Sequence, residues 1–224
     1  MSEVIAPPVT RPRTPATTWI GLFLSLFGML IIRDGFRLIH ADPTSVSSVG
    51  IRELLFYAFA IGLLLFVRFA EHRPLQSVGI GTSKAIKTLA WGCVTAAVCL
   101  LVGGAVGLLT HFNGGQPGRN MARLPVWLLV VIVFRAGIVE ELCYRGYSIE
   151  RLQELGLSKF WAAGIPLIIF AGGHWTGGWS QIAIAFALGA ILAGFYLWRR
   201  DLVANIFAHA LVDFIGVILP RLLS

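Results

Sequence analysis

Charged side chains are scarce in this chain. Of its 224 residues, only 13% are Asp, Glu, Lys or Arg, whereas 57% are hydrophobic. Soluble domains carry about 25% charged residues, which they need to cover their surface, so this composition excludes a soluble globular protein. The apolar residues form blocks near the roughly 20 residues that cross the hydrocarbon core of a bilayer. The sequence therefore predicts an integral membrane protein, with membrane lipid as its first partner.

Three further absences narrow the class of protein. The only cysteines are Cys93, Cys99 and Cys143, and an odd set within apolar segments is no disulfide framework. No basic patch with interleaved aromatic residues is present, so we expect no nucleic-acid partner despite the net charge of +7. No repeat of fixed period is visible. The Lys and Arg residues lie mostly between the apolar blocks, which is typical of loops beside a membrane.

The apolar blocks predict an all-α, polytopic transmembrane helical bundle of about seven spans. We place them at about 16–32, 51–69, 85–110, 125–155, 160–174, 181–198 and 202–219. Residues 111–120 are expected to form a flexible loop, and Pro220 to end the last span. Gly156 is a good C-terminal stop for the fourth. Residues 1–15, rich in Pro and Thr, are expected to be a disordered tail before a single domain at 16–224.

The distribution of Lys and Arg predicts the orientation. More of them fall in connections on the side of the N-terminus than on the opposite side. The positive-inside rule therefore predicts a cytoplasmic N-terminus. We expect a location in a bacterial inner membrane.

One predicted span, the fourth, carries a charged stretch, Arg135-Ala-Gly-Ile-Val-Glu-Glu-Leu-Cys-Tyr-Arg145. Ionisable residues inside a membrane are costly and mark functional sites by default. Glu141 and Arg145 are spaced i,i+4 and can pair on one helix face. Glu140 points ~100° away from Glu141, toward another partner. Arg135 is expected to reach the membrane interface or to pack between helices.

Later spans supply polar side chains that can meet Glu140. At ~1.5 Å per residue, Glu140 and His174 both lie roughly 22 to 24 Å from the turn at 156–159, so antiparallel helices bring them level. The last span carries a polar stripe at i, i+4 and i+8. Polar groups in a bilayer need partners or water. We therefore expect a hydrated cavity lined by Glu140, His174, His209 and Asp213, while Asn205 is either part of it or a contact between helices.

The order and spacing of these residues resemble a known family. Glu140-Glu141-x-x-x-Arg145, Phe170-x-x-x-His174 and His209-x-x-x-Asp213 are similar, in order, to the three motifs of the CPBP (CAAX protease and bacteriocin-processing, or Abi) intramembrane endopeptidases. The resemblance covers about residues 125–220, the protease-like core.

The resemblance implies a role for each motif residue. Glu140 would be the general base that activates water against a peptide carbonyl, with help from His174. His209 and Asp213 would stabilise the oxyanion or orient the water, and Glu141 with Arg145 would be a supporting pair. The implied substrate is a membrane-associated peptide or protein, and nothing in the sequence shows whether it is prenylated.

The chemistry leaves alternatives open. Zinc could be held by Glu140, His174 and His209 with a water in the fourth position, but the H-E-x-x-H signature is absent and we favour a mechanism without metal or other cofactor. Cys143 with His174 as its base is a weaker hypothesis than Cys143 as a small core residue. Phe170 is interpreted as packing, and no role is assigned to the loop histidines.

Two functions compete with the endopeptidase. One is a non-catalytic bacteriocin-immunity or scaffold protein of the same fold, and the other is a proton-coupled transporter. Transporters often show inverted repeats. We interpret the ionisable residues of the predicted spans as clustering in the second half of the chain, which favours the enzyme.

Overall fold

The computed structural model describes residues 15–81 and 83–223. The predicted tail at 1–15 therefore lies, apart from its last residue, outside the described residues. Within the described ranges every regular element is a helix, as the composition predicts. The long helices are α1 (Pro15–Leu38), α2 (Val46–Leu65), α3 (Ala85–Leu109) and α8 (Gly178–Arg199), and α9 (Leu202–Asp213) begins a further long helical run.

Five helical segments are long and apolar enough to cross a membrane: Ala16–Leu38, Val46–Ala70, Ala85–Leu109, Trp175–Arg199 and Leu202–Leu223. The other two predicted spans correspond to helical rods that are not among these five segments. One is the apolar helix α7 (Lys159–Gly172). The other corresponds to the fourth predicted span and is called the fourth rod. It is a continuous helical run through α5 (Val126–Arg135), η3 (Ala136–Glu140), η4 (Leu142–Tyr147) and α6 (Ser148–Glu154). The protein is an integral membrane helical bundle.

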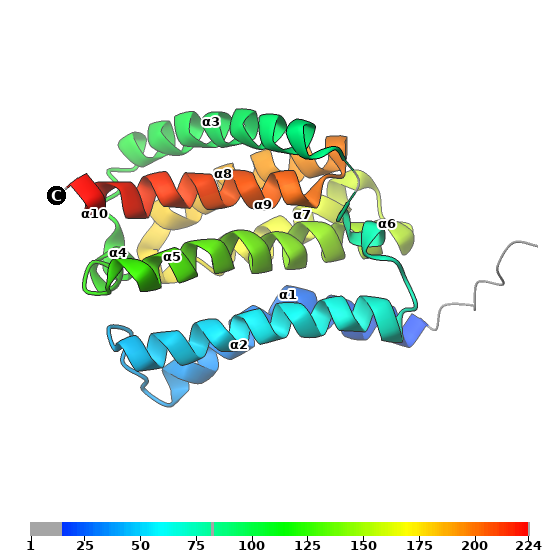
Figure 1. Cartoon of the computed structure of the whole chain (residues 1–224), viewed down its shortest axis with the longest axis horizontal. Coiled ribbons are helices and arrows are strands. Elements are labelled where there is room, and N and C mark those ends of the chain that lie inside the picture. The colour runs from blue at the N-terminus through cyan, green and yellow to red at the C-terminus, as the bar shows by residue number, and fades with distance from the viewer. Residues whose placement is uncertain (1–14, 82, 224) are drawn as a thin grey trace, which may run out of the picture.

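The helices form a layered bundle (Figure 1). The hairpin of α1 and α2 lies on one side, and α3 covers α8 and α9 on the other. The α5–α6 run lies between these layers and contacts both of them. Large apolar side chains such as Leu101 (75% exposed) and Leu108 (80% exposed) cover the outer faces, where lipid rather than water would meet them. The charged stretch is thereby placed at the centre of the bundle.

The charged stretch is wound as π-helix in η3 and η4. In an α-helix, residues five apart point about 140° away from each other. A π turn, which closes i→i+5 hydrogen bonds, brings residue i+5 back over residue i, and such turns are frequent at functional sites. The segment Ala136–Glu140 therefore places Arg135 and Glu140 on the same face.

Two predicted boundaries are wrong. The loop expected at 111–120 contains a helix, α4 (Gly115–Met121). Pro220 was expected to end the last span, but the helical run continues from α9 through η6 (Phe214–Ile218) into α10 (Leu219–Leu223). Proline lacks an N–H but is tolerated in the first turn of a helical segment, and Pro220 is the second residue of α10. Gly156, in contrast, has a φ of +91° and ends the fourth rod as predicted.

The far end of the fourth rod is fastened by ion pairs outside the charged stretch. Arg151 Nη2 donates to Glu71 Oε2 at 2.6 Å, and the Tyr147 hydroxyl donates to Glu71 Oε1 at 2.8 Å. Tyr196 donates to Glu150 Oε1 at 3.0 Å. These contacts tie η4 and α6 to the segment after α2 and to α8, and they hold the end of the helical run that is remote from α5.

Candidate active site within the membrane

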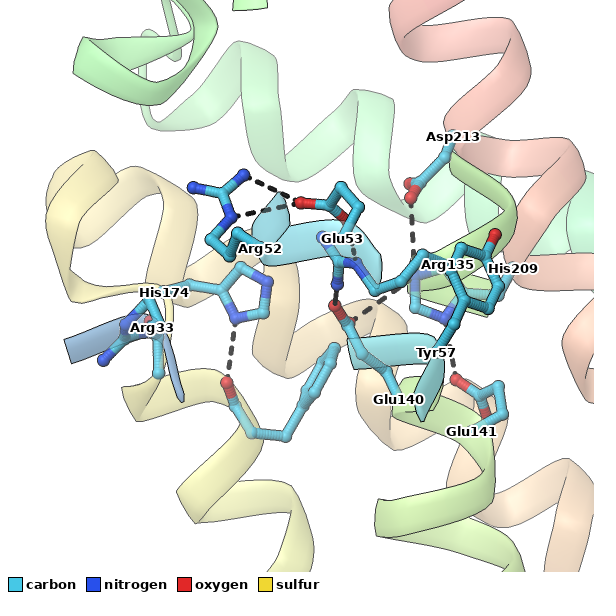
Figure 2. A network of polar contacts seen from close by, with 12 residues as sticks. Arg33, Arg52, Glu53, Tyr57, Arg135, Glu140, Glu141, His174, His209 and Asp213 are labelled. Carbon is cyan, nitrogen blue, oxygen red and sulfur yellow. Dashed lines mark hydrogen bonds and ion pairs between the residues drawn. The ribbon is translucent and has the colours of Figure 1, made fainter. Parts of the chain in front are cut away.

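Glu140 is held by an arginine that joins it to a second helix (Figure 2). Arg135 Nη1 donates to Glu140 Oε1 at 2.7 Å, and Arg135 Nε donates to Glu53 Oε2 at 2.6 Å. The side chains of Arg135 and Glu140 are only 11% and 12% exposed. Glu53, on α2, also accepts from Arg52 at 2.8 Å. Oε1 of Glu140 is thus occupied, while its Oε2 lies 4.0 Å from His209 Nε2.

This network corrects two sequence-based interpretations. Arg135 was expected to reach the membrane interface or to make a packing contact, but it is a nearly buried bridge between Glu53 and Glu140. The ionisable residues were assigned to the second half of the chain, yet Glu53 lies in the first half and is buried. The distribution of ionisable residues between the two halves of the chain therefore no longer disfavours a transporter. A carboxylate inside a predicted span was the signal that should have selected Glu53.

Glu141 connects its own helix to α9. Its Oε1 accepts from Arg145 Nη1 at 2.7 Å and faces His209 Nδ1 at 2.8 Å, and its Oε2 accepts from Asn205 Nδ2 at 3.0 Å. Arg145 Nη2 also reaches the Gly189 carbonyl on α8 at 3.2 Å. The i,i+4 spacing of Glu141 and Arg145 thus corresponds to a real pair, and Asn205 is a contact between helices. Glu141 has no exposed side-chain surface, so it has no room to act on a substrate.

His209 is oriented by Glu141 and faces two further carboxylates. With Nδ1 turned to Glu141, its Nε2 lies 4.0 Å from Glu140 Oε2 and 3.7 Å from Asp213 Oδ2 (Figure 2). The hydrogen bond made by one ring nitrogen of a histidine sets the tautomer and direction of the other. The structure therefore brings Glu140, His209 and Asp213 together, with the free nitrogen of His209 between the carboxylates.

His174 lies apart from this group. It follows the end of α7, and its Nδ1 lies 2.8 Å from the carbonyl oxygen of Phe170. The Phe170 ring packs edge-on against His174, with centroids 4.8 Å apart, and against His209 at 6.4 Å. Arg145 stacks over the same ring at 4.5 Å. Phe170 is a packing residue, as interpreted from the sequence, and it separates the two histidines. Among the described residues, His174 makes no hydrogen bond to Glu140 or His209.

The separated groups border two cavities that share part of their lining. The larger, about 660 Å³, reaches from Glu140, Arg135 and His174 toward the α1–α2 connection and α4. The smaller, about 150 Å³, is bordered by His209 and Asp213 and by His174. The four residues expected to line one cavity therefore border two neighbouring cavities that share part of their wall. Figure 2 shows His174, which follows α7, and Glu140, which belongs to η3, with their side chains turned toward the same region.

The positions of the site residues also bear on two alternatives, a zinc ion and a cysteine nucleophile. In the part of the chain that the structure describes, no group of three or more His, Cys, Asp or Glu side chains is placed to hold a metal ion. Glu140, His174 and His209, the suggested zinc ligands, are divided between the two cavities. The described residues therefore do not fit a zinc site. Cys143 is completely buried in the main apolar cluster, in keeping with a core residue.

Comparison with known proteins gives one match. Residues 122–215 match the family model described as Type II CAAX prenyl endopeptidase Rce1-like. The matching segment begins before α5, ends in η6, and contains Glu140, His174, His209 and Asp213. No curated protein and no solved structure matches the chain. Residues 122–215 of this membrane protein are therefore similar to the Rce1-like CAAX endopeptidases, and the resemblance inferred from its three motifs is confirmed.

Proposed function

We propose that this protein is an intramembrane endopeptidase that hydrolyses peptide bonds of membrane-associated peptides or proteins with a water activated by Glu140. One observation carries the proposal: Glu140, His174, His209 and Asp213 come from three separate parts of the family-matching segment and border neighbouring cavities inside the bundle. A protease of this type needs a base, donors for a developing oxyanion and space for a peptide, all shielded from lipid.

The proposed division of labour follows from which atoms are occupied. Arg135 holds Oε1 of Glu140, so Oε2 is the oxygen that takes the proton from water. His209 has committed Nδ1 to Glu141, and its Nε2 is the group that meets the oxyanion or the water. His174, across Phe170, assists from the opposite wall. When the tetrahedral intermediate collapses, the proton held by Glu140 passes to the leaving amine, as a general base returns it as an acid.

The rival functions can be weighed on the same features. A scaffold protein has no need for a carboxylate whose one free oxygen faces a cavity, and this favours an enzyme. A transporter is no longer disfavoured by the position of its ionisable residues, since Glu53 lies in the first half. The match to an endopeptidase family is the observation that favours proteolysis over transport.

The proposal is tested by cleavage with and without a chelator. The full chain in proteoliposomes is given a peptide that ends in a prenylated cysteine and three further residues, and the same peptide without the prenyl group. We expect cleavage of at least the prenylated form, at a rate that EDTA and 1,10-phenanthroline leave unchanged, because Glu140 is proposed to activate water unaided. Mass spectrometry of the products reports the cleaved bond. Loss of activity that zinc restores would overturn the metal-free step, and failure to cleave either peptide would favour the scaffold.

The side of the membrane from which substrate enters follows from the orientation. The larger cavity extends to the α1–α2 connection, at the end of the bundle opposite the start of α1 (Figure 1). We propose a cytoplasmic N-terminus in a bacterial inner membrane, from the excess of Lys and Arg on that side. The cavity would then open toward the extracytoplasmic face.

Two loop histidines provide a matched pair of positions to test this orientation. His40 and His72 are both exposed, both have positive φ (+53° and +54°), and they lie in connections at opposite ends of the bundle. In intact cells we expect a membrane-impermeant maleimide to label His40→Cys, and to label His72→Cys only after permeabilisation. The three native cysteines are first replaced by alanine. The reverse pattern would place the cavity mouth in the cytoplasm, where it could receive a prenylated protein tail.

A further inference from the structure

Gln181 lies where the two cavities meet. It belongs to the first turn of α8, and of the described residues only Phe170, His174 and Gln181 line both spaces. Glu140 lines the larger cavity but not the smaller one, whereas His209 lines the smaller cavity but not the larger one. Gln181 is therefore in reach of a peptide in either cavity.

The carboxamide of Gln181 makes no hydrogen bond to any described residue, and its Oε1 is buried. Leaving a buried polar atom unpaired costs free energy, and native proteins do so rarely. The local sequence makes room for this arrangement. A Cβ on Gly177, whose φ is an ordinary −90°, would come within 1.4 Å of Gln181 Oε1. The glycine thus leaves the space in which the unpaired amide lies.

The chemistry of the group suggests what it binds. A carboxamide offers N–H donors and a carbonyl acceptor, the same groups that a peptide unit offers in return, and it carries no charge. It suits a neutral peptide backbone better than a phosphate or a carboxylate, for which the larger cavity has arginines in its wall. Backbone contacts also leave the side chains of a substrate free to differ.

We infer that Gln181 is a positioning residue that hydrogen-bonds a backbone peptide group of the substrate as the chain passes from one cavity into the other. The inference rests on the proposed endopeptidase function. It assigns Gln181, which lies outside the three motifs, to substrate binding rather than to the chemical step. It also explains an unpaired amide beside His174 that the fold itself does not need.

Gln181→Met removes both hydrogen-bonding groups and keeps the length of the side chain. We expect kcat/KM for peptide cleavage to fall about tenfold, mostly through a higher KM, which corresponds to one hydrogen bond of about 1.4 kcal/mol. The unfolding temperature should stay the same or rise, because the variant loses an unpaired buried atom. A structural role would move both quantities downward together. Gln76→Met is the matched control, since Gln76 is exposed and far from both cavities.

A binding measurement separates this inference from the proposed function. A fluorescent, uncleaved peptide is titrated into Glu140→Gln and into Glu140→Gln/Gln181→Met, both as full chains in nanodiscs. We expect about tenfold weaker binding to the double variant. Equal affinities, or no detectable binding to Glu140→Gln, would overturn the role of Gln181. Absence of cleavage by the wild-type chain, together with the expected loss of affinity, would overturn the endopeptidase and leave a peptide-binding site.

Discussion

Replacing Glu140 with glutamine is expected to lower the rate of peptide cleavage by about 10²- to 10⁴-fold, the usual contribution of a general base. The amide has the size of the carboxylate and can still accept from Arg135, so the contact at 2.7 Å is kept. What is lost is the ability of the free oxygen to take a proton from water. Arg135 also retains Glu53 at 2.6 Å, so the substitution leaves no buried cation without a counter-ion. The measurement is the initial cleavage rate in proteoliposomes.

The control for this variant is Glu154→Gln. Glu154 lies on α6 in the same helical rod, is partly exposed, and pairs with Arg73 at the far end of the bundle. The control should keep nearly the full rate. A Glu140→Gln protein that folds, binds the peptide and cleaves it at a rate like that of the control would exclude Glu140 as the base.

The helices and the motif residues of this site were predictable from the sequence because each depends on local information. Apolar blocks set the spans, and the i,i+4 spacing placed Glu141 beside Arg145. The partner of Arg135 was not predictable in this way. Glu53 lies 82 residues earlier, near the predicted start of a span, where a carboxylate is easily interpreted as belonging to the interface. Only the packing of α2 against the fourth rod turns it into a buried partner.

The π-helical winding of the fourth rod was also not predictable from the periodicity of the sequence. A period of 3.6 residues places Arg135 and Glu140 on different faces. The π turn at Ala136–Glu140 adds the residue that brings them together. No residue type in that segment indicates such a turn. For His174, helix arithmetic predicted the depth well enough to reach the cavity. It missed that α7 ends at Gly172, so the imidazole stands on a connection and is separated from His209 by Phe170.

Replacing Glu141 with leucine is expected to cost about 3 to 5 kcal/mol of stability, the usual penalty for removing one partner of a buried ion pair. Glu141 accepts from Arg145 and Asn205 and orients His209, so one substitution breaks contacts within its helix and with α9. Arg145 would keep only the Gly189 carbonyl as a hydrogen-bond acceptor, with a side chain that is 2% exposed. The measurement is the unfolding transition of the full chain in detergent, followed by circular dichroism.

A double variant distinguishes the buried charge from lost packing. In Glu141→Leu/Arg145→Met both charges are gone, and two apolar side chains of similar size remain between α8 and α9. Because the cost of the single change comes chiefly from the stranded guanidinium, we expect the double variant to regain most of the lost stability. Cleavage should not return with it, since His209 has lost the acceptor that directs its Nε2 toward Glu140 and Asp213. Stability that falls further in the double variant would show that Arg145 is held by its stacking on Phe170 and the Gly189 carbonyl, and that Glu141 serves chiefly to orient His209.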